Sequence, residues 1–320
     1  MSVTLGYACI SIVGRKNGIY TGRTAMLKTV EKQGVDLLIS LARANAADLA
    51  ALIEFNEARS YRFFRISSDI FPHITNPRAP SYSITCAADE LAEAGGLARS
   101  YGHRITMHPG QFVQLGSPRP EVVKQSIAEL NHHADILTAM GLTTQHGSVI
   151  IVHAGGVFGD KAAALDRWRQ TYRRLPESTR QFIVLENDDY HYNVKELLPL
   201  CEELHIPLCV DFFHHACYGA AEFDIYDPVL IERVMSTWRG RGIKPKCHWS
   251  AQAPGARLGS HSDYIENIPA QLLKIAAQYD CDIMCECKMK DECMAALLEK
   301  YFDKKIAAGG LYYELRAEYH

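Results

Sequence analysis

The stretch QFIVLEN, residues 181–187, holds the pattern that decides the fold. Four apolar residues, 182–185, run directly into a carboxylate, Glu186, although strands are usually bounded by turn residues. Asn187 and two aspartates follow at once. A buried run that ends in an acid indicates a strand that opens into a polar site.

Runs of the same kind recur along the chain. Short apolar runs suited to strands cover residues 3–9, 61–67, 103–108, 148–153, 181–186, 206–211, 244–249 and 281–286. Segments with apolar residues three and four apart, as in helices, lie between them at 36–58, 121–140, 193–204, 227–238 and 264–279. Strands that alternate with helices indicate a parallel sheet covered by helices. Eight such units predict an α/β fold, a single (β/α)8 TIM barrel, as one domain over residues 1–320. An open doubly wound sheet is the alternative, but no GxGxxG motif follows the first run.

Histidine or a carboxylate stands at the end of six consecutive predicted strands. These residues are His108, His153, Glu186, Asp211, His248 and Glu286. The carboxyl ends of barrel strands meet at one rim, which is the active-site face. Each residue alone could be an ordinary rim residue, but six in series, all of metal-binding types, indicate a common site. His214 and His261 lie just outside the runs and are further candidates.

The ligand types limit the metal and the reaction. This set exceeds the three protein ligands of a typical catalytic zinc site and suits two or three divalent ions. Imidazole and carboxylate ligands fit both zinc and manganese. A metal cluster suits phosphodiester hydrolysis, in which one ion generates hydroxide and the others stabilise the attacking and leaving oxygens. Sugar isomerases also use paired metals in barrels and remain an alternative.

Bulk composition limits the partners. The chain has 320 residues, 48% of them hydrophobic, and a net charge of -3, which argues against a protein held to nucleic acid by charge alone. Positive charge from bound metal ions would remove that objection. No basic leader and no apolar stretch of membrane-spanning length is present, so we expect no membrane contact and a cytoplasmic protein, with a nuclear location also open. No feature indicates an obligate protein partner.

The ten cysteines contain no CxxC pair. Cys281, Cys285 and Cys287 lie close enough in sequence to suggest a zinc cluster. A strand period of two, however, puts Cys285 and Cys287 on one face and Glu286 on the other. We therefore expect these cysteines to be small core residues.

Nine motifs give the chain a family resemblance. They are LGYACIS (5–11), YRFFRISSDIFP (61–72), MHPGQF (107–112), VHAGG (152–156), LEND (185–188), VDFFHH (210–215), KCHWS (246–250), GSHSDYI (259–265) and MCECKMK (284–290). In this order they resemble the UV damage endonucleases, repair enzymes of the (β/α)8 type related to endonuclease IV. The resemblance implies nicking of UV-damaged double-stranded DNA on the 5′ side of cyclobutane pyrimidine dimers and (6-4) photoproducts. It also implies a cluster of divalent ions, manganese in preference to zinc.

The resemblance further assigns roles to residues. The implied metal ligands are His108, His153, Glu186, Asp211, His214, His248, His261 and Glu286, with Glu186 bridging two ions. The implied lesion and DNA contacts are Tyr7, Ser11, Gln111 and Phe112, where Ser11 replaces a usual asparagine and Phe112 a usual tyrosine. The family often has a histidine where Asn76 stands, and His73 is three residues earlier. Both are kept as candidate site residues.

Basic residues supply the remaining candidates. Lys246 stands two residues before His248, so both side chains point the same way on a strand. Lys246 would act on phosphate or be carboxylated, as in some family members, and we include it with Glu186 as catalytic. Candidate phosphate contacts are Arg15, Lys16, Arg78, Arg119, Arg257, Lys288 and Lys290. The rival functions are an abasic-site endonuclease of the endonuclease IV type, a sugar isomerase or epimerase, and a non-catalytic binding protein.

Overall fold

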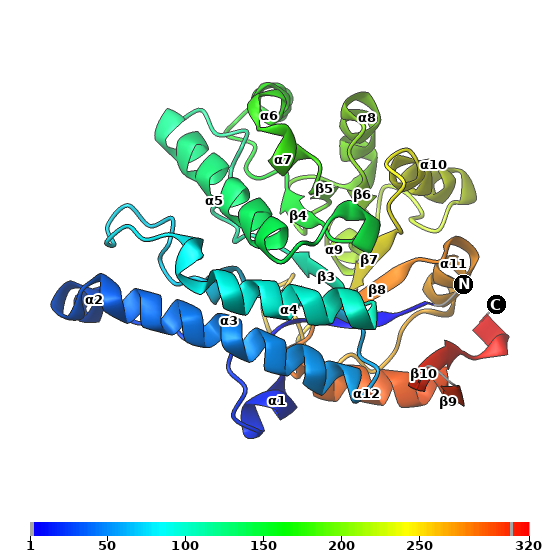
Figure 1. Cartoon of the computed structure of the whole chain (residues 1–320). Helices are drawn as coiled ribbons and strands as arrows, with labels where there is room; N and C mark the ends of the chain where they lie inside the picture. The colour runs from blue at the N-terminus through cyan, green and yellow to red at the C-terminus, as the bar shows by residue number, and fades with distance from the viewer. Residues whose placement is uncertain (1–2, 308–309, 320) are drawn as a thin grey trace.

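The computed structural model describes residues 3–307 and 310–319, and in these ranges eight parallel strands form a nearly closed barrel (Figure 1). The strands are β1 (Leu5–Cys9), β2 (Phe63–Ile66), β3 (Arg104–Met107), β4 (Ile150–His153), β5 (Ile183–Glu186), β6 (Leu208–Cys209), β7 (Lys246–Trp249) and β8 (Asp282–Cys285). Hydrogen-bonded neighbours run in the order β6-β5-β4-β3-β2-β1-β8-β7. The predicted (β/α)8 barrel is confirmed.

The barrel closes between β6 and β7, which are joined by an isolated bridge. A single parallel bridge joins Asp211 to His248, and the His248 amide donates to the Val210 carbonyl at 2.9 Å. Strand β6 is short because Asp211 already serves as the N-cap of the next helix. Two candidate metal ligands thus form the pair that closes the barrel wall.

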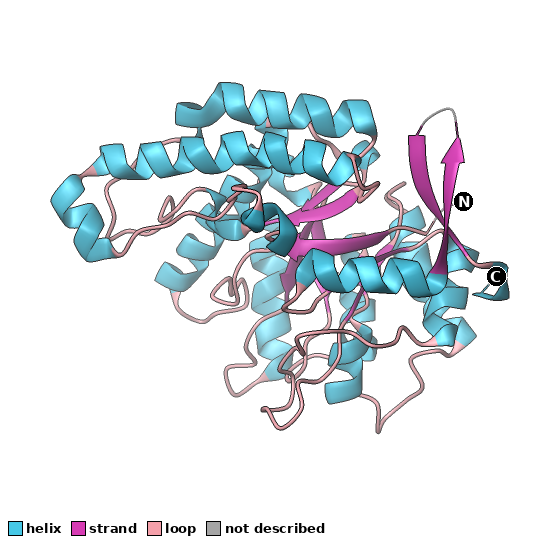
Figure 2. Ribbon diagram, turned by 90° about the horizontal axis from the view of Figure 1, so that it is seen from below, coloured by secondary structure: helices cyan, strands magenta, loops and turns pink. Residues whose placement is uncertain are grey.

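Helices surround the barrel (Figure 2). They are α1 (Ile12–Lys16), α2 (Leu27–Gln33), α3 (Val35–Glu57), α4 (Ala88–Tyr101), α5 (Pro120–Ala139), α6 (Lys161–Arg174), α7 (Glu177–Arg180), α8 (Val194–Leu204), α9 (Phe212–Cys217), α10 (Pro228–Arg239), α11 (Ala270–Tyr279) and α12 (Lys290–Tyr301). Four short 3-10 turns cover Ser68–Ile70, Ile84–Ala87, Thr144–His146 and Ala317–Tyr319 within the described ranges. No helix of these ranges has the length and apolarity to cross a membrane.

One predicted helix is shorter than expected. Periodicity predicted a helix over 264–279, but α11 begins only at Ala270. Proline disfavours helical conformation in the residue before it, and Pro269 is the residue at the N-cap. The apolar spacing has another cause, since Ile265 and Ile268 are buried from a non-helical segment.

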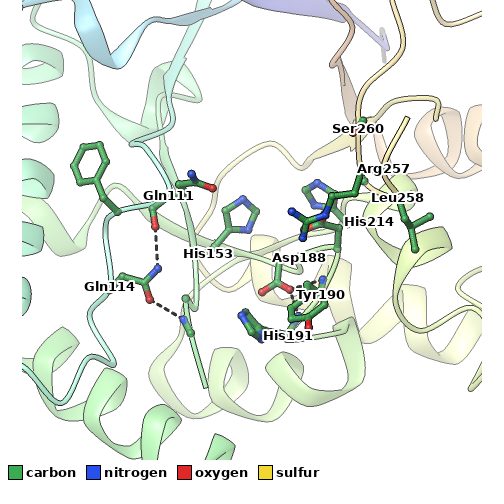
Figure 3. A pocket seen from close by; sticks show the side chains of 15 residues that line it. Gln111, Gln114, His153, Asp188, Tyr190, His191, His214, Arg257, Leu258 and Ser260 are labelled. Atoms are coloured by element: carbon green, nitrogen blue, oxygen red, sulfur yellow. Dashed lines mark hydrogen bonds between the residues drawn. The ribbon is translucent and has the colours of Figure 1, made fainter. Parts of the chain in front are cut away.

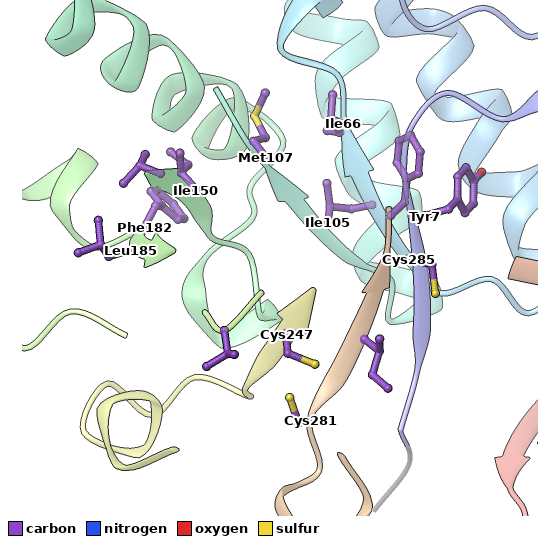
Figure 4. Close-up of a cluster of buried hydrophobic side chains, with 14 of the residues drawn as sticks. Tyr7, Ile66, Ile105, Met107, Ile150, Phe182, Leu185, Cys247, Cys281 and Cys285 are labelled. Carbon is purple, nitrogen blue, oxygen red and sulfur yellow. The ribbon is translucent and has the colours of Figure 1, made fainter. Parts of the chain in front are cut away.

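Strand alternation divides the side chains into two sets. One set, including Ile105, Ile150 and Leu185, joins the main apolar core that the barrel shares with its helices (Figure 4). Along β5 the alternate residue, Val184, belongs to a separate cluster with Ile151. The next residue of that second set is Glu186, so the same period carries the acid to the barrel mouth.

The cysteines follow the core prediction. All ten are free thiols. Cys285 and Cys287 are buried in the apolar core, whereas Glu286 contacts charged groups at the mouth. The groups of potential metal ligands in the described residues contain no cysteine.

A C-terminal hairpin, β9 (Phe302–Ala307) with β10 (Gly310–Leu315), stands outside the barrel (Figure 2). Phe302 and Leu315 are buried at its base, and most of its remaining residues are exposed. This segment carried no motif in the sequence, and its position outside the barrel agrees with that.

Candidate metal centre

The strand ends bring the predicted ligands together at the barrel mouth. Three groups of potential ligands form, and within each group the ligand atoms lie within 4.8 Å of one another. The groups are His108, His153 and Glu186; Glu186, Asp211 and His214; and Asp211, His248 and Glu286. Shared members link the groups into one cluster. Because the side chains of a strand alternate, one residue at the end of each strand can face this common space.

Glu186 lies at the centre of the cluster and is fully buried. Its Oε2 lies 3.0 Å from His108 Nε2 and 3.7 Å from His153 Nε2. Its Oε1 lies 2.6 Å from His248 Nδ1 and 3.8 Å from His214 Nδ1. Each carboxylate oxygen therefore faces a different pair of imidazoles, the arrangement expected of a carboxylate between two ions.

Asp211 begins helix α9 and is also fully buried. Its Oδ1 accepts the amide hydrogen of His214 at 2.8 Å, as an N-cap does. Its Oδ2 has no hydrogen-bond partner among the described residues. The nearest imidazole nitrogen, His214 Nδ1, lies 3.5 Å from it, and a buried carboxylate oxygen without a hydrogen bond is costly, so this atom has capacity for a further ligand.

Asn187, the residue after Glu186 in the opening stretch, holds the neighbouring backbone in place. Its side chain donates to the Asp211 carbonyl at 2.9 Å and accepts from the Asp211 amide at 2.8 Å. Its own carbonyl lies 3.0 Å from His214 Nδ1. The Asn187 side chain thus replaces strand pairing at this point and orients two candidate ligands.

Glu286 lies on the opposite side of the mouth, on the loop that follows β8. Its Oε1 lies 3.2 Å from His248 Nδ1, and its Oε2 lies 3.9 Å from His261 Nδ1. Arg65 of β2 also pairs with Glu286. Sequence reasoning missed Arg65, although its place two residues after the buried Phe63 could have indicated that it faces the mouth.

Lys246 lies below His248 and is almost completely buried. Its Nζ lies 2.7 Å from His248 Nε2. Burial lowers the pKa of Lys246 to about 8, and the nearby Arg65 and Arg104 act in the same direction. Lys246 is therefore close to titrating at physiological pH.

Carboxylates and imidazoles of the cluster shift one another's pKa values. Burial would raise the pKa of Glu186, but His248 and His153 outweigh it and hold the pKa well below the usual value. Burial raises the pKa of Asp211. Burial would lower the pKa of His214, but Asp211 and Glu186 outweigh it and raise it to about 9. Carboxylates and imidazoles compete here for protons that a divalent cation would displace.

These residues fit the divalent ions that the ligand types imply. The donors are imidazole nitrogens and carboxylate oxygens, which suit manganese or zinc. The missing hydrogen bond at the buried Asp211 Oδ2 supports such an occupant independently of any sequence pattern. His261 is the outermost of the eight predicted ligands, with a side chain 29% exposed.

A pocket of about 710 Å³ opens next to the cluster (Figure 3). Its lining includes His153 and His214, so the pocket reaches the candidate ligands. The other lining residues are Gln111, Phe112, Gln114, Gly155, Gly156, Asp188, Asp189, Tyr190, His191, Arg257, Leu258, Gly259 and Ser260. Gln111 and Phe112, predicted as lesion contacts, are exposed there, and Phe112 is 55% exposed.

Tyr7 and Ser11, the other two predicted lesion contacts, do not reach this surface. Tyr7 is fully buried, and its hydroxyl donates to Asn56 Oδ1 of α3 at 2.7 Å. Ser11 is buried, caps α1 and donates to Asp291 at 2.5 Å. As placed here, both support the barrel wall, and their contact with DNA stays a prediction.

His73 and Asn76 lie in the loop after β2. The Asn76 amide is 3.3 Å from His73 Nδ1, and His73 Nε2 is 2.8 Å from the Ala25 carbonyl. Neither residue belongs to the groups of potential ligands found among the described residues. The structure therefore does not bring them into the cluster.

Of the predicted phosphate contacts, Arg257 lines the pocket. Lys16 pairs with Glu292, and Lys288 pairs with Asp263. Arg257 is thus the candidate whose position beside the cluster is clearest.

Comparisons with known proteins agree with this geometry. A model of the family described as UV-endonuclease UvdE matches residues 3–311. A protein of Acanthamoeba polyphaga mimivirus, whose assigned function as a UV-damage endonuclease is provisional, is 44% identical over 94% of this chain and 92% of that protein. The UV-damage endonuclease of Schizosaccharomyces pombe is 37% identical over 93% of this chain, which spans 50% of that relative's length.

A solved structure matches as well. The crystal structure of SacUVDE aligns with a TM-score of 0.80 at 28% identity, covering 93% of this chain and 98% of that chain. The chain therefore belongs to the UV-endonuclease UvdE family.

Proposed function

We propose that the chain is a DNA repair endonuclease that nicks duplex DNA immediately 5′ to UV photoproducts, namely cyclobutane pyrimidine dimers and (6-4) photoproducts. The observation that carries this proposal is the linked set of ligand groups at the barrel mouth beside an open pocket. Family membership supports UV-damage endonuclease activity in DNA repair. The position of the nick is the finer part of the proposal.

Divalent ions bound at the mouth, two or three per chain and manganese by preference, would activate water and neutralise charge on the phosphodiester. The predicted ligands would hold these ions, with Glu186 between two of them. Asn187 orients Asp211 and His214, and Arg65 orients Glu286. Such positioning is a recurrent requirement for metal ligands.

Two residues would act outside the ligand set. Lys246, with its lowered pKa, would hold or move a proton beside His248. Gln111 and Phe112 would enter the duplex beside the lesion, where an exposed ring can insert between poorly stacked bases. A dimer that stacks poorly lowers the cost of this opening.

The test is an incision assay on a labelled duplex that carries one defined thymine dimer, with manganese present. An undamaged duplex and an abasic duplex serve as controls. We expect one nick on the 5′ side of the dimer. Cutting of the abasic strand alone would indicate the endonuclease IV type of activity, and no cutting of any duplex would favour a sugar substrate.

A further inference from the structure

Exposed apolar side chains gather at the pocket beside the cluster. Ten large apolar side chains of the described residues are exposed, and three of them line this pocket: Phe112, Tyr190 and Leu258. Tyr190 is 68% exposed and Leu258 is 63% exposed. An even spread over the surface would place fewer there, and clustered exposed apolar groups mark binding sites.

The pocket has two sides, each formed by two loops (Figure 3). Residues 111–114 and 155–156 form the first bank, and residues 188–191 and 257–260 form the second bank. In the first bank the Gln114 side chain accepts the Gly156 amide at 2.6 Å and donates to the Gln111 carbonyl at 2.8 Å. The first bank is therefore tied together by one side chain.

Each loop of the second bank is held by hydrogen bonds of its own. The Gln252 side chain donates to the Arg257 carbonyl at 3.0 Å and accepts the Gly259 amide at 3.0 Å. Asp188 Oδ1 accepts the Tyr190 amide at 2.9 Å. These bonds hold the backbones beneath Tyr190 and Leu258 in place while both side chains stay exposed.

The two loops of the second bank also touch. Gly259 has a φ of +86°, and a Cβ built on it would lie 2.0 Å from Asp189 Oδ2. A side chain at this position would displace the Asp189 carboxylate, so the glycine allows the two loops to lie in contact. Ordering costs little binding energy when a surface is preformed.

We propose that Tyr190 and Leu258 form a second, preformed contact surface for nucleobases, opposite Gln111 and Phe112. The inference rests on the proposed function, because it takes damaged DNA as the ligand. Opening the duplex between the banks exposes base faces on both sides, and base faces stack on aromatic and apolar side chains. The second bank would favour DNA that is already distorted, since intact stacking must be broken to reach it.

The test measures binding by fluorescence anisotropy, using a duplex with one thymine dimer and its undamaged match. A Glu186→Gln background prevents cutting and leaves both banks unchanged. We expect Tyr190→Ala with Leu258→Ala to reduce the preference for damaged DNA by about 10-fold, the scale of a lost base stack. Tyr190→Phe should keep the preference, because the ring that stacks is retained.

Val229→Ala provides a matched control, since Val229 is 70% exposed on α10 and does not line the pocket. Unfolding temperatures of all variants should agree. 2-Aminopurine placed opposite the dimer should brighten on binding to the parent and brighten less with the double variant. A purely structural role would not produce this difference.

An unchanged preference in the double variant overturns the inference, as does an equal loss on damaged and intact DNA. A parent protein that binds neither duplex overturns it too. If binding preference depends on Tyr190 and Leu258 but the wild-type protein cuts no DNA, the inference stands and the proposed function fails. If the wild-type protein cuts and the double variant keeps its preference, the reverse holds.

Discussion

Both ends of the barrel interior bury charged side chains, but the two ends differ in how those charges are hydrogen-bonded. At the amino end, Arg104 donates to Asp282 and to the carbonyls of Gly147, Lys244 and Pro245. At the carboxyl end, Asp211 Oδ2 is buried without a hydrogen bond among the described residues, and the nearest imidazole nitrogen, His214 Nδ1, is 3.5 Å away. The amino end satisfies its charges with protein groups, while the carboxyl end leaves capacity for a ligand.

The difference follows the division of labour expected of a (β/α)8 barrel, where one face stabilises and the other carries chemistry. A buried charge that is fully hydrogen-bonded holds elements together. A buried carboxylate oxygen without a hydrogen bond leaves room for a ligand to bind. Changes at the two ends should therefore damage different properties.

Metal removal should have the largest effect on activity, and it should affect only the carboxyl end of the barrel. Exhaustive chelation should abolish nicking, and added manganese should restore it, because the cluster at the mouth then loses its occupant. The same treatment should leave the Arg104–Asp282 pair intact. Incision is measured beside the metal content of the protein. Full activity in protein shown to be metal-free would refute the metal centre.

Glu186→Gln should reduce nicking by at least about 100-fold, since even outer partners of metal ligands typically cost 10- to 100-fold. Glutamine keeps the size of the side chain but removes the charge between the two imidazole pairs. The unfolding temperature should change little. Near-wild-type incision by this variant would exclude a bridging role for Glu186.

Arg104→Leu should reverse the pattern and damage stability. The buried Asp282 would keep Lys244 at 2.8 Å but lose Arg104, so we expect a cost of about 3 kcal/mol of unfolding free energy, the low end for a broken buried pair. The double variant Arg104→Leu with Asp282→Leu should be less destabilised than the sum of the singles. Denaturant unfolding measures both, and incision per folded molecule at low temperature should stay near wild type. A selective loss of incision would show that the two ends are not separate.

The metal-free mouth should also respond to pH. Burial raises the pKa of Asp211, and the net effect of burial and neighbouring carboxylates raises that of His214 to about 9. A raised folded-state pKa stabilises at low pH and loses that stabilisation as pH rises through it. His153 and His248 have lowered pKa values, so they affect the pH dependence of stability only below about pH 6.5. Lys246 affects it only above about pH 8.

The unfolding temperature of metal-free protein should therefore fall between pH 6.5 and about 8. Manganese should weaken this dependence, because the metal displaces the protons. Calorimetry across the pH range, with and without manganese, is the measurement. A rise in unfolding temperature over this window without metal would contradict the proposed electrostatics.

Gln111→Ala should have the smallest effect, a loss of a few-fold in discrimination between damaged and intact duplex. Gln111 is an exposed residue of the first bank and does not contact the buried charged groups of the cluster. Competitive incision of the two duplexes measures it. Identical discrimination would remove Gln111 from the proposed lesion contacts.

The sequence by itself determined the barrel and most of the cluster. Alternating apolar runs and helical spacing specify eight strand–helix units, and a strand period of two carries residues such as His153 and Glu186 to one rim. These are local patterns, so they can be read without knowing which segments meet. The predicted start of helix α11 was too early, because the buried Ile265 continues the apolar spacing of a helix.

Only the tertiary structure decided which side chains complete the site. Arg65 reaches Glu286 across 221 positions of sequence, and Tyr7 turns away from the mouth towards Asn56. The second bank depends on Gly259 of one loop packing against Asp189 of another. Contacts of this kind depend on how separate loops and helices pack in space, which local spacing does not encode.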